Sequence, residues 1–251
     1  MIAVAVVGAL GRMGREVVRL VEQADDLALV GAFDRLAASE AARTPLARDL
    51  GATLAHARVV IDFSSPEGTR DLVTRAAALG VAVVSGTTGL GPDERAALEA
   101  ASRIVPVVHA PNMSVGVHVL LGLVAEAARK LGPEFDIEVV EMHHRHKVDA
   151  PSGTALRIAE SIQGVRPGLR AVHGRSGAAG PRGGDEIGIL ALRGGDVVGD
   201  HQVLFAGPGE RVEIAHRASS RETFARGALR AARWVHGRPA GLFGMADVLA
   251  G

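Results

Sequence analysis

Residues 2–14 read IAVAVVGALGRMG and contain the clearest indication of fold class in the sequence. Residues 2–7 are a continuous apolar run of isoleucine, alanine and valine, typical of a strand buried on both faces of a parallel sheet. The run is followed by a G-x-x-G-x-x-G loop from Gly8 to Gly14 and by a helical pattern over residues 12–23. A buried strand, a glycine loop and a helix in this order predict the first unit of a doubly wound α/β domain.

Further apolar runs alternate with helical patterns in the first half of the chain. The runs cover residues 27–33, 59–63, 81–84 and 104–108, and the helical patterns cover residues 66–79 and 93–102. This alternation predicts right-handed βαβ units and an open parallel sheet, as in a Rossmann-like domain.

The pattern changes after about residue 113. A helical pattern over residues 114–131 is followed by strand-like stretches at residues 136–142, 186–192, 197–205 and 211–216. The last three are separated by short glycine-rich breaks, which predicts an antiparallel or mixed sheet in an α+β domain. Residues 165–185 are rich in Gly, Pro and Arg, and we expect a long mobile loop there. The final helical pattern, residues 221–235, is free to pack on either domain.

The composition argues against several classes of protein. The chain has 28 Lys and Arg and 28 Asp and Glu residues, so no general attraction to nucleic acid or to a membrane surface is expected. Aromatic residues make up 3%, which argues against base-stacking nucleic-acid modules, and the absence of cysteine excludes thiol nucleophiles and disulfides. The apolar N-terminal run lacks the features of a secretory signal, and no run reaches the roughly 20 residues that span a bilayer. We therefore expect a cytoplasmic protein.

The glycine loop and an acidic residue after the second strand predict a dinucleotide site. The amides and helix N-terminus that would meet a pyrophosphate belong to Gly8, Ala9, Leu10, Gly11, Arg12 and Met13. Asp34 ends the second strand, where its carboxylate could accept hydrogen bonds from ribose hydroxyls, whereas Arg35 could accommodate a 2′-phosphate. The choice between NADH and NADPH stays open. The alternative is a set of ordinary turn glycines beside a surface carboxylate, since the spacing departs from G-x-G-x-x-G.

Two further loops follow the fourth and fifth predicted strands. They contain Gly86, Thr87 and Thr88, and Ala110, Pro111, Asn112 and Met113. Ligands of open α/β sheets bind beyond the carboxyl ends of the strands, so both loops are expected to reach the nicotinamide half of a dinucleotide. Two plain turns are the alternative, because Gly, Pro and Asn favour turns.

A second candidate site is the segment EMHHRHKVDAPSGT, which runs from Glu141 to Thr154 and concentrates cationic and titratable groups. Its histidines suit proton donation near neutral pH, and Lys147 can hold a carboxylate and polarise an imine. Ser152 and Gly153 lie with Thr154 at the start of a predicted helix, where backbone amides form a second anion site. The segment predicts a substrate with two carboxylates together with a proton transfer.

Other interpretations of this segment remain. A solvated charged loop is the default for a run of charges. A metal site at His143, His144 and His146 lacks the usual ligand spacing, and Arg145 and Lys147 would repel the ion, so we expect no metal. A nucleic-acid patch would be longer and would have aromatic neighbours.

The segment Glu141–Ala155, together with Gly8–Gly14, Gly86–Gly89 and Ala110–Val117, closely resembles the 4-hydroxy-tetrahydrodipicolinate reductase family, also called dihydrodipicolinate reductases. Phe205–Ala228 looks like the same family, so the resemblance spans nearly the whole chain. It implies NADH- or NADPH-dependent reduction of a cyclic dicarboxylate in the diaminopimelate and lysine pathway.

The resemblance also implies a domain division and an assembly. Residues 1–113 and 220–251 would form the dinucleotide-binding domain, and residues 114–219 the substrate-binding and oligomerisation domain with a mixed sheet. The last helix would return to the nucleotide domain, and the protein would be a homotetramer.

Matching positions carry implied roles. His143 corresponds to a proton donor and Lys147 to a second catalytic residue, while His144 and the Gly153–Thr154 pair match substrate-binding positions. The positions that match nucleotide contacts are Gly8–Met13, Asp34, Gly86–Thr88 and Ala110–Met113. The resemblance departs at Met113, where many relatives have an aromatic residue.

Three rival functions differ in what they predict. A related Rossmann-type enzyme acting on another imine or amino acid would not bind pyridine-2,6-dicarboxylate, a planar mimic of the expected substrate. A nucleotide-sensing module would need neither His143 nor Lys147. A metal-dependent hydrolase would lose its activity with a chelator.

Overall fold

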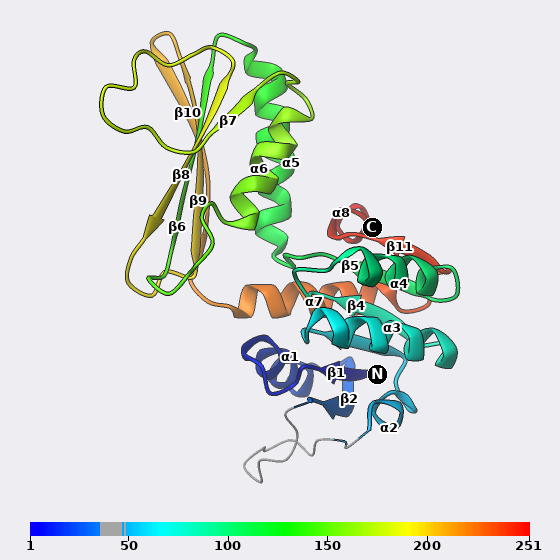
Figure 1. Cartoon of the computed structure of the whole chain (residues 1–251). Helices are drawn as coiled ribbons and strands as arrows, with labels where there is room; N and C mark the ends of the chain where they lie inside the picture. The colour runs from blue at the N-terminus through cyan, green and yellow to red at the C-terminus, as the bar shows by residue number, and fades with distance from the viewer. Residues whose placement is uncertain (36–46, 48) are drawn as a thin grey trace. The chain divides into compact units, whose positions relative to one another are not determined.

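The structure, a computed structural model, describes residues 1–35, 47 and 49–251. These residues form two compact units (Figure 1). The first comprises Met1–Val115 and Arg221–Gly251, and the second comprises Gly116–Ser220. Both termini belong to the first unit. Within the described ranges, no helix is long and apolar enough to cross a membrane.

The first unit contains a six-stranded parallel sheet, as predicted from the alternation of apolar runs and helices. Its strands are β1 (Ile2–Val7), β2 (Leu27–Phe33), β3 (Val59–Asp62), β4 (Ala82–Ser85), β5 (Pro106–His109) and β11 (Gly241–Phe243). Their order is β11-β5-β4-β3-β1-β2. β2 lies on one side of β1, and β3 with all later strands of this sheet lies on the other side. The strand order therefore reverses between β1 and β3, which makes this the topological switch point of the sheet.

Helices cover both faces of this sheet because each strand divides its apolar side chains between two cores. Along β1, Val4 and Val6 lie in one core, and Ala5 and Val7 lie in the other. The first core holds side chains of α1 (Arg12–Glu22), α7 (Glu222–Val235) and α8 (Met245–Ala250). The second holds side chains of α2 (Leu50–Leu54), α3 (Pro66–Leu79) and α4 (Pro92–Ser102). Apolar residues on both faces explain why the strand sequences are continuously hydrophobic.

The second unit is a five-stranded mixed sheet with two helices, which confirms the predicted α+β class. The strands are β6 (Asp136–His143), β7 (Arg170–Val172), β8 (Glu186–Arg193), β9 (Gly199–Gly207) and β10 (Glu210–Ala218), in the order β10-β9-β6-β8-β7. β8 pairs in parallel with β6 and β7, and β9 pairs antiparallel with β6 and β10. The helices α5 (Val115–Leu131) and α6 (Gly153–Gln163) pack on one face of the sheet (Figure 1).

Several local predictions were wrong. Residues 165–185 were expected to form one long mobile loop, but they contain the strand β7, and Arg175 and Arg182 form ion pairs with Glu138 on β6 at 3.1 and 3.0 Å. The strand β11 and the helices α2 and α8 were not predicted, because three to six residues carry too little periodicity to be recognised. The fifth strand begins at Pro106 instead of residue 104, since Ile104 is 66% exposed.

Candidate active site

The glycine loop after β1 is tied to the end of β2. The amides of Gly8 and Ala9 donate to the carbonyl oxygen of Phe33 at 2.9 and 3.1 Å. The amide of Leu10 donates to Asp34 Oδ2 at 2.9 Å, and Asp34 is only 8% exposed. These three predicted contact residues therefore use their amides within the chain, and Asp34 also holds the loop in place.

Close backbone contacts explain two of the glycines. Gly8 has φ +77°, a left-handed conformation that favours glycine, and a Cβ on Gly14 would overlap the Gly8 carbonyl group. Gly11 is the N-cap of α1 and provides no side-chain cap. The first amides of a helix have no intrahelical partner, so the N-terminus of α1 can accept an anion.

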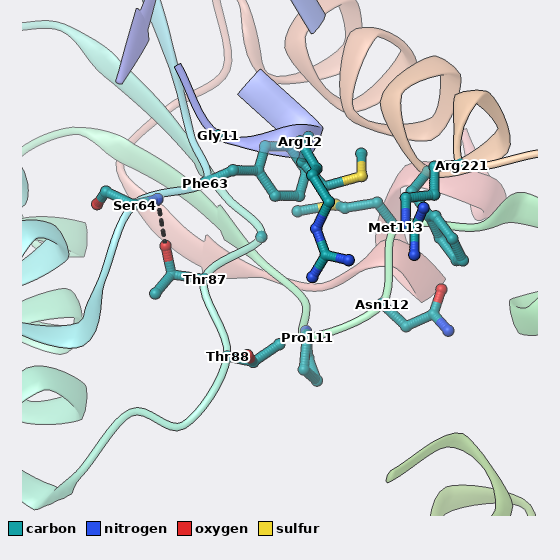
Figure 2. A pocket seen from close by; sticks show the side chains of 13 residues that line it. Gly11, Arg12, Phe63, Ser64, Thr87, Thr88, Pro111, Asn112, Met113 and Arg221 are labelled. Carbon is teal, nitrogen blue, oxygen red and sulfur yellow. Dashed lines mark hydrogen bonds between the residues drawn. The ribbon is translucent and has the colours of Figure 1, made fainter. Parts of the chain in front are cut away.

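A cavity of about 480 Å³ lies beyond the carboxyl ends of β1, β3, β4 and β5, which is where open α/β sheets bind their ligands. Figure 2 shows the loops that line it and the side chain of Arg12 extending into it. The predicted contact residues that line the cavity are Gly11, Arg12, Met13, Gly86, Thr87, Thr88, Pro111, Asn112 and Met113. The switch-point cavity thus brings three separate predicted loops together.

Other predicted contacts lie outside the cavity lining. These are Gly8, Ala9, Leu10, Asp34, Arg35 and Ala110. Sequence reasoning missed Phe63, Ser64 and Arg221, which do line the cavity. Phe224 lines the cavity as well, and it also packs against the first core. Phe63 and Ser64 could have been predicted, because they directly follow β3 at the edge of the sheet where ligands bind.

A buried carboxylate holds two of the cavity loops. Asp62 ends β3, has no exposed surface, and accepts hydrogen bonds from the hydroxyls of four residues. The donors are Ser64 at 2.6 Å, Thr69 at 2.6 Å, Ser85 at 2.8 Å and Thr87 at 2.9 Å. The amide of Ser64 donates to Thr87 Oγ1 at 3.2 Å, which joins the loops directly (Figure 2).

The second group of predicted residues lies in the second unit and starts on β6. Strand alternation places Glu141 and His143 on the helix-facing side of the sheet, in line with the core residues Ile137 and Val139. Glu141 has no exposed surface, and His143 is 9% exposed. His143 Nδ1 lies 2.6 Å from Glu141 Oε2, so a histidine and a carboxylate form a buried pair.

The segment after β6 supplies the other predicted residues. Lys147 Nζ donates to both carboxylate oxygens of Asp149 at 2.8 and 2.9 Å, and this hydrogen bond and charge hold the pKa of Asp149 below its usual value. The imidazole rings of His144 and His146 are 6.2 Å apart. In this structure Lys147 is therefore paired within its own loop.

Ser152 is the N-cap of α6, and Gly153 and Thr154 are its first residues. Ser152 Oγ accepts from the amide of Ala155 at 3.2 Å, while the Ser152 amide donates to Glu141 Oε1 at 3.0 Å. The Ser152 amide, which was predicted to bind a substrate carboxylate, is paired with Glu141 in this structure. This hydrogen bond connects the start of α6 to the buried pair of Glu141 and His143.

His201 on β9 is a neighbour that sequence reasoning missed. It is 4% exposed, its ring centroid lies 5.2 Å from that of His143, and its Nε2 lies 3.2 Å from Ser152 Oγ. Burial and the nearby His143 lower the pKa of His201 to about 4. The antiparallel register, which pairs His201 with Glu141, brings it to the site.

No group of three or more His, Asp or Glu side chains is placed to hold a metal ion in the described ranges. Each unit thus holds a candidate site of its own. The second unit has a cluster of histidine, glutamate and lysine side chains around β6, and the first unit has a cavity beyond the ends of its parallel strands.

Comparisons with known proteins match both units. A family model described as "Dihydrodipicolinate reductase, N-terminus" matches residues 2–113, and another described as "Dihydrodipicolinate reductase, C-terminus" matches residues 116–249. Proteins named 4-hydroxy-tetrahydrodipicolinate reductase from Anaeromyxobacter dehalogenans (strain 2CP-1) and Alkalilimnicola ehrlichii are 50% and 49% identical to this chain. These matches cover 99% and 98% of this chain and 98% of each relative.

A solved structure is similar over the same extent. It is the dipicolinate-bound dihydrodipicolinate reductase from Paenisporosarcina sp. TG-14, with a TM-score of 0.80, 27% identity and 97% of each chain covered. Sequence and structure therefore agree over both units, and the chain belongs to the dihydrodipicolinate reductase family.

Proposed function

We propose that this chain is an oxidoreductase that reduces 4-hydroxy-tetrahydrodipicolinate to tetrahydrodipicolinate, a step of the diaminopimelate and lysine pathway. The observation that carries the proposal is the buried pair of His143 and Glu141 at the head of the segment that ends at Thr154. A histidine held by a carboxylate beside a lysine and a helix N-terminus suits proton transfer to a substrate with carboxylate groups.

The first unit would hold a nicotinamide dinucleotide. The cavity has room for part of such a ligand, the N-cap Gly11 has no side chain over the amides of α1, and Arg12 can pair with a pyrophosphate. The bound reduced nicotinamide would supply the hydride. The chain's own groups would orient it and exclude water.

Asp34 and Arg35 would decide between NADH and NADPH. Asp34 is buried and its negative charge opposes a 2′-phosphate, whereas the exposed Arg35 favours one. We propose that the enzyme accepts both nucleotides, and that the opposing charges of Asp34 and Arg35 set its preference between them.

The second unit would hold the dicarboxylate substrate and provide the proton. We assign proton donation to His143 and carboxylate binding to Lys147, with further contacts from His144 and from the Gly153–Thr154 turn at the start of α6. Lys147 would exchange its pairing with Asp149 for the substrate carboxylate. Ser152 would support the site through α6 and Glu141 instead of touching the substrate.

The assembly we propose is a homotetramer that forms through the second unit. α5 and α6 pack on one face of its sheet, and the opposite face carries Leu190 and Leu192, which are 36% and 49% exposed. Exposed leucines on a sheet face favour association with another copy. Light scattering should give the mass of four chains, and Leu192→Lys should give a smaller species.

An absorbance assay tests the reaction. The protein would be mixed with enzymatically generated 4-hydroxy-tetrahydrodipicolinate and with NADH or NADPH in parallel, and nucleotide oxidation would be followed. Oxidation that requires both protein and substrate, and that pyridine-2,6-dicarboxylate inhibits, is the expected result. Protein that binds NADH but oxidises neither nucleotide would contradict the proposal and favour another imine substrate or a nucleotide sensor.

A further inference from the structure

Glu141 lies where a charged group is unfavourable. It has no exposed surface and continues the apolar row of β6 that includes Ile137 and Val139. A buried carboxylate is stable only if hydrogen bonds replace the water that it has lost. The hydrogen-bond partners of Glu141 therefore determine whether its carboxyl group is ionised.

Three groups donate to this carboxylate. Arg193 on β8 donates from Nη1 to Oε2 at 2.8 Å and from Nη2 to Oε1 at 3.0 Å, a two-point pairing that fits a guanidinium group and a carboxylate. The Ser152 amide donates to Oε1 at 3.0 Å, and His143 Nδ1 lies 2.6 Å from Oε2. Burial raises the pKa of Glu141, but these hydrogen bonds outweigh burial and hold it below the usual value, so the group is ionised.

An ionised carboxylate can only accept hydrogen bonds, so His143 Nδ1 must carry a proton. Nε2 is then the ring nitrogen that can exchange one. Among the described residues, Nε2 has no hydrogen-bond partner, and it lies 3.0 Å from where a Cβ on Gly199 would stand. Arg193, which pairs with the carboxylate, and His201, whose ring centroid is 5.2 Å from that of His143, are the charged or titratable neighbours of this pair.

We propose that Glu141 is a positioning residue, which fixes His143 with Nδ1 protonated and reserves Nε2 for proton transfer to the substrate. The proposal rests on the proposed function. The 4-hydroxyl group of the substrate leaves as water together with a neighbouring ring hydrogen, which gives an unsaturated ring. Hydride addition to this ring leaves an electron pair, and this pair takes the Nε2 proton of His143, whose ring has taken up a second proton from solvent. The ring ends neutral with its Nδ1 proton still on Glu141, which stays a carboxylate throughout.

Three variants of the full-length protein test this role. Glu141→Gln keeps the shape of the side chain but removes its charge, and its amide can donate to Nδ1. Glu141→Asp keeps the charge. Glu138→Gln is the matched control, because Glu138 is also on β6 and paired with arginines, but it does not touch His143.

The first readout is the tautomer of His143, measured by ¹⁵N NMR without substrate. We expect the Nδ1-protonated form in the parent protein, in Glu141→Asp and in Glu138→Gln, and the Nε2-protonated form in Glu141→Gln. The second readout is kinetic. Glu141→Gln should lower kcat about 100-fold or more with KM for NADH unchanged, and Glu141→Asp should recover part of the loss.

The results separate this inference from the proposed function. A Glu141→Gln protein with the parent tautomer and a kcat within threefold of Glu138→Gln would overturn the role of Glu141. If Glu141→Gln does not fold by circular dichroism, a folded Glu141→Asp protein that lacks the Nδ1 proton would overturn it as well. A parent protein that does not reduce the substrate would contradict the proposed function, while the tautomers would still decide what Glu141 does.

Discussion

Thr87 donates a hydrogen bond of 2.9 Å to the buried carboxylate of Asp62, although 25 residues separate them in the sequence. The Thr87 hydroxyl also accepts the amide of Ser64 at 3.2 Å. Thr87 and Ser64 both line the nucleotide-sized cavity, so Asp62 holds the loops after β3 and β4 in place around it. Because the end of every parallel strand lies at the same edge of the sheet, one carboxylate can organise loops from different strands.

Thr87→Val should therefore loosen the cavity as well as destabilise the fold. Valine has the same shape but removes the donor to Asp62 and the acceptor of the Ser64 amide, which should cost about 1–3 kcal/mol. Urea unfolding would measure this loss, and a fluorescence titration with NADH should show weaker binding. Thr74→Val is the control, because Thr74 is exposed and its hydroxyl donates to the Arg70 carbonyl oxygen of its own helix. Equal stability and NADH affinity in the two variants would contradict this role of Asp62.

Two helical glycines should respond to alanine in opposite directions. A Cβ on Gly227 of α7 would overlap the carbonyl oxygen of Met113, whereas a Cβ on Gly122 of α5 would meet none of the described residues within 4 Å. Alanine usually stabilises a helix interior by about 1 kcal/mol relative to glycine. Gly122→Ala should gain about this amount, while Gly227→Ala should lose stability and weaken NADH binding by displacing the Met113 loop. Thermal unfolding that shows a gain in both variants would contradict the close packing of α7.

The sequence predicted the features that depend on local pattern. The buried strand before Gly8 and the alternation that follows it led to the parallel sheet, and the segment around His143 led to the second site. The contacts of Arg221 and His201 were missed because they depend on long-range packing and strand register, which place residues that are far apart in sequence side by side. The hydrogen bond from the Ser152 amide to Glu141 was missed for the same reason, because the sequence does not show that Glu141 is buried beside the start of α6.

Removing His143 should affect turnover far more than nucleotide binding. A positioned proton donor contributes about 10²–10⁴ in rate, so His143→Ala should lower kcat by two to four decades while the NADH affinity of the first unit stays the same. Steady-state kinetics and NADH titration measure the two effects separately. A turnover within threefold of the parent protein would exclude His143 as the donor.

Nucleotide preference should follow the charges at positions 34 and 35. Asp34→Asn keeps an acceptor for the Leu10 amide but removes the charge that opposes a 2′-phosphate. We expect the ratio of kcat/KM for NADPH to that for NADH to rise about tenfold in this variant and to fall about tenfold in Arg35→Ala. Ratios that stay the same in both variants would place the selecting groups elsewhere.

Stability should depend on pH through His201. Its pKa is about 4 in the folded chain because burial, followed by the charge of His143, disfavours the protonated ring, compared with an ordinary value of 6.5. Above pH 6.5 neither state is protonated, so the group contributes nothing there. Between pH 6.5 and about 4 only the unfolded chain takes up the proton, so the free energy of unfolding falls as the pH falls, by about 3 kcal/mol at the lower end.

Replacing His201 should remove this part of the pH dependence. His201→Asn keeps a polar side chain beside Ser152 but cannot take up a proton, so its stability should fall less between pH 6.5 and 4 than that of the parent protein. His173→Asn is the matched control, since it makes the same substitution at an exposed position. Urea unfolding at a series of pH values measures both slopes. Both variants remove one histidine from the unfolded chain, so a difference between their slopes of unfolding free energy against pH reports the burial of His201 in the folded protein. Equal slopes would contradict the prediction, because they would mean that His201 is protonated as readily in the folded protein as in the unfolded one.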